Sequence, residues 1–151
     1  MREKESLRLR CLGGAVGGLA ATVVMTTGLT FSDRLGVRNR QPPRKIVQAA
    51  LPDLPKDTLD TVAVVTHFGY GAAAGALYAA AIPARFRNPA TGTGYGLLIW
   101  ALAYEGWLPA LGVVPAAHRE KWSRALTMLL AHVLYGATLG LVGKLRIPTS
   151  S

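Results

Sequence analysis

The chain has 151 residues, enough for one domain; half of them are hydrophobic and only 17% are charged. With a mean hydropathy of +0.28, this composition fits a small membrane protein with polar loops better than a soluble domain. The net charge of +9 does not indicate nucleic-acid binding, because the basic residues are spread over the termini and connections and no groove-reading motif occurs. The single cysteine, Cys11, excludes a disulfide framework.

Four stretches with almost no charge predict membrane-spanning helices near residues 11–31, 62–82, 92–114 and 125–143. Each reaches the roughly 20 residues that a helix needs to cross about 30 Å of hydrocarbon. The first stretch is longer than the apolar part of a signal peptide, which predicts an uncleaved helix. We therefore expect an all-α integral membrane protein, a bundle of four helices forming a single domain over residues 1–151.

The connection over residues 32–61 is the longest. Within it, Pro42 and Pro43 favour a helix start, and the apolar side chains that follow share one face. We predict a short helix near 43–51 that lies in the membrane interface. Four spans place both termini on one side of the membrane. The two sides carry 8 and 9 basic residues, which does not fix the orientation; we expect cytoplasmic termini.

The pattern H-x-x-Y-G-A-x-x-G occurs twice, at an offset of 65 residues. Its two copies are His67, Tyr70, Gly71, Ala72 and Gly75, and His132, Tyr135, Gly136, Ala137 and Gly140. The first and third spans match more weakly at an offset of 78. This internal repeat predicts two related helical hairpins.

Pairs of glycines four residues apart occur in every predicted span. On a helix this spacing makes a flat strip on which a second backbone can approach closely, so we expect the pairs to pack helices together; a sliding seam for conformational change is the alternative. The glycines concerned are Gly14 and Gly18, Gly71 and Gly75, Gly92 and Gly96, and Gly136 and Gly140.

Each histidine of the repeat precedes its glycines at helical spacing and should face the bundle. Glu105, in the third span, should lie toward the same membrane surface, because that helix runs the opposite way. A carboxyl at such a depth needs a partner; candidates are the histidines, Tyr104, Arg119 and Lys121. The predicted intramembrane polar cluster is His67, Glu105, His132, Tyr70 and Tyr135.

Three interpretations of this cluster stay open. Its members could form structural hydrogen bonds between helices, relay protons or ions, or use His67 and His132 to ligate haem iron or another metal. No catalytic motif such as H-E-x-x-H, a nucleophile elbow or a phosphate loop occurs, so we predict neither an enzyme nor a cofactor.

The leading hypothesis is a structural or complex-forming bundle, and the alternative is a proton- or ion-coupled small transporter or channel. Expected partners are the lipid bilayer and, through self-association or other membrane subunits, further helices; nucleic acid is not expected.

Three segments together resemble a known group of proteins. They are H-F-G-Y-G-A-A-A-G-A-L-Y from residue 67, Y-E-G-W-L-P-A-L-G-V-V-P from residue 104, and L-L-A-H-V-L-Y-G-A-T-L-G from residue 129. Over residues 13–145 the chain resembles small bacterial inner-membrane proteins of the YagU-like kind and related uncharacterised families. This resemblance implies four helices in a bacterial cytoplasmic membrane. It implies no established activity, although an acid-tolerance role is associated with such proteins, and it assigns no catalytic residues.

Overall fold

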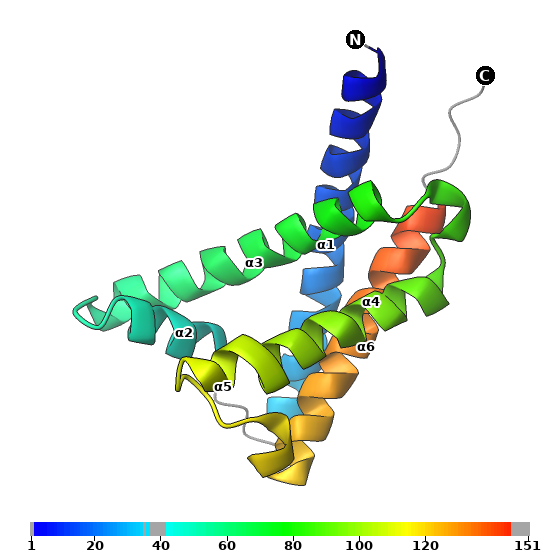
Figure 1. The fold of residues 1–151 in the computed structure, drawn as a ribbon. Coiled ribbons are helices and arrows are strands. Elements are labelled where there is room, and N and C mark those ends of the chain that lie inside the picture. Colours follow the sequence, from blue (N-terminus) through cyan, green and yellow to red (C-terminus); the bar gives the residue numbers. More distant parts are fainter. Residues whose placement is uncertain (1, 35, 37–41, 146–151) are drawn as a thin grey trace.

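The computed structural model describes residues 2–34, 36 and 42–145, and this part of the chain is helical throughout, without strands (Figure 1). The elements, in chain order, are α1 (Arg2–Arg34), α2 (Pro42–Ala50), α3 (Lys56–Ala81), η1 (Ala84–Phe86), α4 (Pro89–Ala101), η2 (Leu102–Trp107), α5 (Leu108–Ala110), η3 (Ala117–Arg119) and α6 (Trp122–Leu145). The all-α class predicted from the sequence is therefore confirmed.

Three helices in the described part are long and apolar enough to cross a membrane: Ser6–Arg34, Lys56–Ala81 and Trp122–Leu145. They contain the predicted spans near 11–31, 62–82 and 125–143, except that α3 ends one residue earlier. Each also begins earlier than predicted. An apolar run marks only the part of a helix that suits hydrocarbon, and in α1 the arginines, lysine and glutamates before it are good helix formers that prolong it.

The predicted span 92–114 is divided. Asn88 caps α4 by accepting hydrogen bonds from two backbone amides, and Thr91 returns the bond in a capping box. After Ala101 the helix widens into the π-helical η2, where Gly106 has non-helical angles (φ −107°, ψ −107°). Pro109 accounts for the widening, because its ring lacks an N–H and would clash with a carbonyl one turn earlier. α4 alone is too short to count among the three candidate spans.

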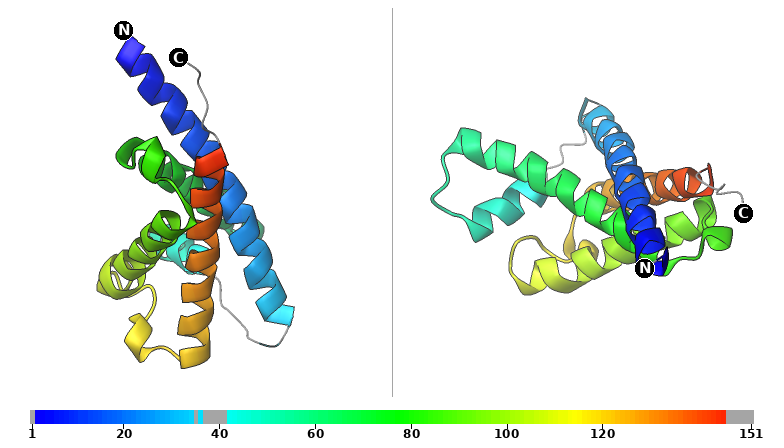
Figure 2. Two further views of the ribbon diagram at one scale, coloured as in Figure 1. Left: turned by 90° about the vertical axis from the view of Figure 1, so that its right-hand side faces the viewer. Right: turned by 90° about the horizontal axis from the view of Figure 1, so that it is seen from above.

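Two pairs of helices organise the fold. α1 packs against α3, α4 packs against α6, and α1 and α6 join the pairs. Figures 1 and 2 show α3 and α4 crossing α1 and α6 and extending to the same side, where α2 and α5 lie near their far ends.

Glycines form both crossings. A Cβ atom added at Gly18 would meet the backbone of Gly71, and one added at Gly75 would meet the backbone of Gly14 and Gly18. Backbone thus lies directly on backbone between α1 and α3. The same holds between α4 and α6, where the glycines involved are Gly92, Gly96, Gly136 and Gly140.

The short helix predicted near 43–51 is present as α2, but the structure corrects its surroundings. Val47 is buried against Leu59 of α3, and Ile46 packs on the central core. Arg44 ties α2 to α3 through an ion pair of 2.6 Å with Asp60. Ile46 and Val47, on the apolar face that was expected to rest in lipid, are thus covered by protein, because α3 begins early enough to lie against α2, whereas Ala50 and Leu51 stay exposed.

The three helices that are apolar enough to cross a membrane carry hydrophobic side chains on their exposed faces as well as on their buried faces. Large hydrophobic side chains are exposed along α1 and α6, among them Leu12, Val16, Leu19, Val23, Leu130, Leu134 and Leu141. A helix that is apolar all round is one that is surrounded by protein or lipid on every side. The outer faces of these helices are therefore suited to a bilayer.

Candidate ligand cavity between the helix pairs

A cavity of ≈ 230 Å³ lies where the helix pairs diverge. α1, α2, α3, α4, η2, α5 and α6 all contribute to its walls, which are mostly apolar. Four of the five residues of the predicted cluster line it: His67 and Tyr70 from α3, and His132 and Tyr135 from α6. The two copies of the repeated pattern thus meet at one cavity.

The glycine crossing explains where the cavity opens. Gly14, Gly18, Thr22 and Thr26 follow one another at helical spacing on α1. The first two touch glycines of α3, whereas Thr26 faces His67, with 3.4 Å between its Oγ1 and the Nε2 of the ring. Larger side chains replace glycines at this point, so the backbones separate and a space remains between the pairs.

His132 is tied to its own helix. Its Nδ1 lies 2.8 Å from the carbonyl oxygen of Met128, and because a carbonyl only accepts, that nitrogen carries the proton. In the neutral ring Nε2 is then an acceptor. The side chain therefore offers a lone pair rather than an N–H.

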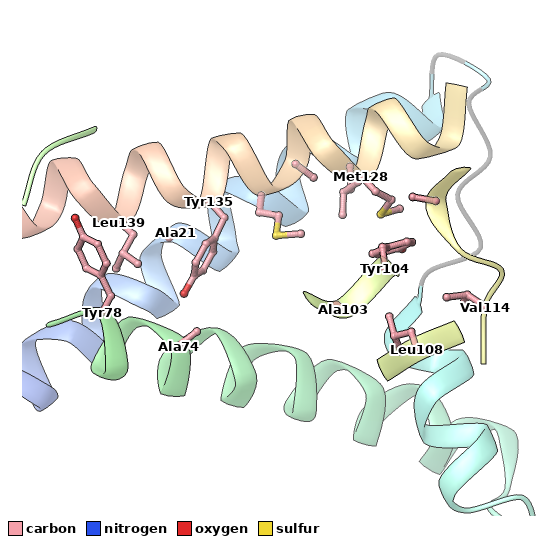
Figure 3. Packing of buried hydrophobic residues seen from close by; sticks show 14 residues of the cluster. Ala21, Ala74, Tyr78, Ala103, Tyr104, Leu108, Val114, Met128, Tyr135 and Leu139 are labelled. Atoms are coloured by element: carbon pink, nitrogen blue, oxygen red, sulfur yellow. The ribbon is translucent and has the colours of Figure 1, made fainter. Parts of the chain in front are cut away.

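Tyrosine hydroxyls join the two helix pairs. Tyr135 of α6 is buried and donates to the carbonyl oxygen of Gly71 at 2.8 Å, and Tyr95 of α4 donates to that of Ala74 at 2.9 Å. Figure 3 shows Tyr135 reaching from α6 toward α3. Tyr70 makes no such bond to another helix of the described chain, and 53% of its surface is exposed.

Glu105 does not join the cluster, which corrects the prediction. It does not line the cavity, and its carboxylate accepts hydrogen bonds from Nδ1 of His118 at 2.8 Å and from the backbone N–H of the same residue at 3.1 Å. Neither of the repeat histidines, nor Tyr104, Arg119 or Lys121, is its partner. The wider turn of η2 directs Tyr104 and Trp107 to the cavity and leaves the Glu105 side chain 39% exposed.

Several lining residues were not singled out from the sequence. Thr26 could have been found, because it continues the helical stripe of Gly14 and Gly18. Ile46 and Trp107 could not, because their positions depend on how α2 folds back and on the π-helical turn. Among the described residues there is no group of three or more histidine, cysteine or acidic side chains that could hold a metal ion.

The fold and the cavity define a small all-helical protein with three helices suited to a membrane and an apolar interior space edged by histidine and tyrosine. Residues 9–148 match DUF6789, a family of unknown function, and the chain belongs to that family. No curated protein and no solved structure matches it.

Proposed function

We propose that the protein is a non-enzymatic membrane protein that binds a small hydrophobic molecule between its helix pairs. The observation that carries this proposal is the convergence of both H-x-x-Y copies on one mostly apolar cavity. Small-molecule sites are typically concave and apolar, with a few polar groups that orient the ligand. The exposed apolar faces of α1 and α6 support a position in the bilayer, from which such a ligand would enter.

The volume limits the size of the ligand. An engineered apolar protein cavity of about 150 Å³ binds benzene, so ≈ 230 Å³ holds a substituted six-membered ring or a short alkyl chain. Tyr70 and His67 can donate a hydrogen bond at one wall, and His132 offers an acceptor at another. A ring that carries oxygen substituents, such as a quinone or a phenol, combines the required size with these polar contacts.

The finer membrane arrangement is part of the same proposal. α4, η2 and α5 follow one another without a break from Pro89 to Ala110, a length that suits a fourth crossing. The equivalent glycine contacts in the two helix pairs support an origin from two related hairpins. The resemblance to small bacterial inner-membrane proteins supports a cytoplasmic membrane location.

A proton or ion pathway has less support. It would need Glu105 and the two histidines along one polar route, whereas Glu105 is held by His118 away from the cavity. The hydroxyl of Tyr135 is not free for a relay either, because it donates its hydrogen bond to the carbonyl of Gly71 in α3. The remaining polar groups suit recognition of a single bound molecule better than a relay.

Tryptophan fluorescence can test ligand binding. Trp107 lines the cavity, while Trp122 lies outside it with 77% of its surface exposed. A variant that retains only Trp107 would be titrated in detergent micelles with a benzoquinone carrying a short alkyl chain. We expect saturable quenching, and its loss in Ala103→Leu, because residue 103 is a buried part of the cavity wall.

A variant that retains only Trp122 is the matched control and should show only the linear quenching caused by probe dissolved in the micelle. Circular dichroism and gel filtration would establish that Ala103→Leu is folded. Identical quenching curves for the two single-tryptophan variants, or saturable quenching that persists in folded Ala103→Leu, would rule the cavity out as the binding site.

A further inference from the structure

A separate groove of ≈ 500 Å³ lies between α1, α3 and α6, close to the end of α3. It shares no lining residue with the central cavity. Leu9, Leu139 and Val142 give it an apolar lining, and glycines of α1 and α6 lie beside them. Among the described residues, two charged side chains line the groove: Arg10 from α1 and Arg87 from the turn before α4.

The two arginines converge on one backbone oxygen. Nη2 of Arg10 lies 3.0 Å from the carbonyl oxygen of Ala79, and Nη2 of Arg87 lies 2.6 Å from the same atom. Arg87 also donates through Nε to the carbonyl of Ile82 at 2.9 Å. The carbonyls at a helix C-terminus carry a partial negative charge, which attracts the guanidinium groups but does not neutralise two full charges.

Among the residues whose side chains are described (6–34, 36 and 43–145), no carboxylate pairs with either arginine and no acidic residue lines the groove. Burial, together with the positive charge of Arg10, lowers the pKa of Arg87. The opposite charge of a bound anion would offset both effects, because it favours the charged form of the guanidinium.

We propose that this groove binds an anionic phospholipid, with the phosphate between Arg10 and Arg87 and an acyl chain along Leu9 and Val142. Arg10 directly precedes the apolar run of α1, which places it at the level of lipid headgroups. Basic pockets between membrane helices are known to hold anionic headgroups, and guanidinium groups match phosphate with paired hydrogen bonds. The adjoining apolar lining favours a lipid over a water-soluble anion.

Native mass spectrometry of the full chain in detergent can test this site, with phosphatidylglycerol and phosphatidylcholine added in equal amounts. We expect preferential retention of phosphatidylglycerol. Arg10→Gln should weaken its binding about fivefold, the contribution of one cation near an anionic surface. The carbonyl of Ala79 keeps its bond from Arg87, and the other bond lost is an exposed one of 3.3 Å from Arg10 to the carbonyl of Ala80.

Arg8→Gln is the matched control. It removes the same charge two residues away on α1, from an exposed side chain that does not line the groove, and should leave retention unchanged. Arg10→Lys, which keeps the charge, should bind more phosphatidylglycerol than Arg10→Gln.

Three results would overturn the proposal: equal retention by Arg10→Gln and the native chain, an equal loss in Arg8→Gln, or full displacement of the lipid by inorganic phosphate. The last result would indicate a site for a water-soluble anion. Because the groove and the central cavity share no residue, these outcomes are independent of the function proposed above.

Discussion

Replacing Gly92 with alanine should weaken the packing of α4 on α6, whereas the same change at Gly94 should not. A Cβ atom at Gly92 would lie 2.7 Å from the amide nitrogen of Gly140 and 2.8 Å from its Cα, and closer still to the carbonyl oxygen of Gly136. These are backbone atoms, so no side chain can rotate to make room. A Cβ atom at Gly94 would meet nothing within 4 Å.

The expected sign of the effect differs between the two positions. Carbon atoms attract best at about 3.5–4.0 Å, so α4 must withdraw by roughly 1 Å, and a gap of that size loses up to about half of the dispersion attraction. Overpacking of this kind costs about 1–3 kcal/mol, and alanine in place of helical glycine returns about 0.5–1 kcal/mol. Gly92→Ala should therefore lose up to about 2.5 kcal/mol of stability, while Gly94→Ala should gain about 0.5–1 kcal/mol, so that the two variants differ by about 1–3 kcal/mol.

Unfolding by sodium dodecyl sulfate added to mild detergent micelles, followed by circular dichroism, gives the comparison directly. Both variants carry the same substitution in the same helix, so they differ only in what the new methyl group touches. Gly75→Ala and Gly69→Ala repeat the comparison on α3, where again only the first position faces backbone. Equal unfolding midpoints within each pair would refute the backbone contacts described for the crossings.

Three further substitutions probe other contacts. Tyr135→Phe removes a buried hydrogen bond between α6 and α3 and should cost about 0.5–1.5 kcal/mol in the same unfolding assay. Its control, Tyr70→Phe, breaks no hydrogen bond between helices of the described chain and should not shift the midpoint. Equal effects would contradict the different environments of the two hydroxyls. Arg87→Gln should cost about 1 kcal/mol, because its side chain loses two hydrogen bonds, to the carbonyls of Ala79 in α3 and of Ile82 just after it. The comparison is Arg85→Gln, which loses only the exposed contact of its guanidinium with the Phe86 ring and should cost less; a neutral result for Arg87→Gln would contradict the capping. Glu105→Ala should speed hydrogen exchange in the connection after α5 without changing the overall midpoint, and unchanged exchange there would show that the bonds to His118 do not order that connection.

The position of the cavity could be predicted largely from helical spacing. His67 and His132 each precede two glycines at intervals of four, so each had to lie on the stripe that faces a neighbouring helix. The glycines then required the closest approach of the backbones to occur one or two turns away from the histidines. The shared stripe and the position of the closest approach together place a space beside both histidines, and neither depends on the loops.

The environment of Glu105 could not be predicted in this way. A straight helix over 92–114 would have turned its side chain toward the bundle, but Pro109 forces a π-helical turn that changes the direction of every side chain around it. Its partner, His118, lies thirteen residues further on and is brought close only by the way that the connection after α5 folds back. Contacts that depend on the path of an irregular segment leave no periodic pattern in the sequence.

The two copies of the H-x-x-Y-G-A-x-x-G pattern differ in what they contribute to the cavity. In α6, Tyr135 is buried and bonded to α3, and His132 has its Nδ1 bonded to its own helix. In α3, Tyr70 has no hydrogen bond to another helix of the described chain, and within the same residues the hydrogen bond of His67 is the long contact of 3.4 Å with Oγ1 of Thr26. A buried polar group that already has a partner cannot turn to a ligand without losing that bond. Of the α6 copy only Nε2 of His132 is left for a ligand. In the site proposed above, the polar contacts would therefore come unequally from the two copies: His67 and Tyr70 from α3, and this single nitrogen from α6.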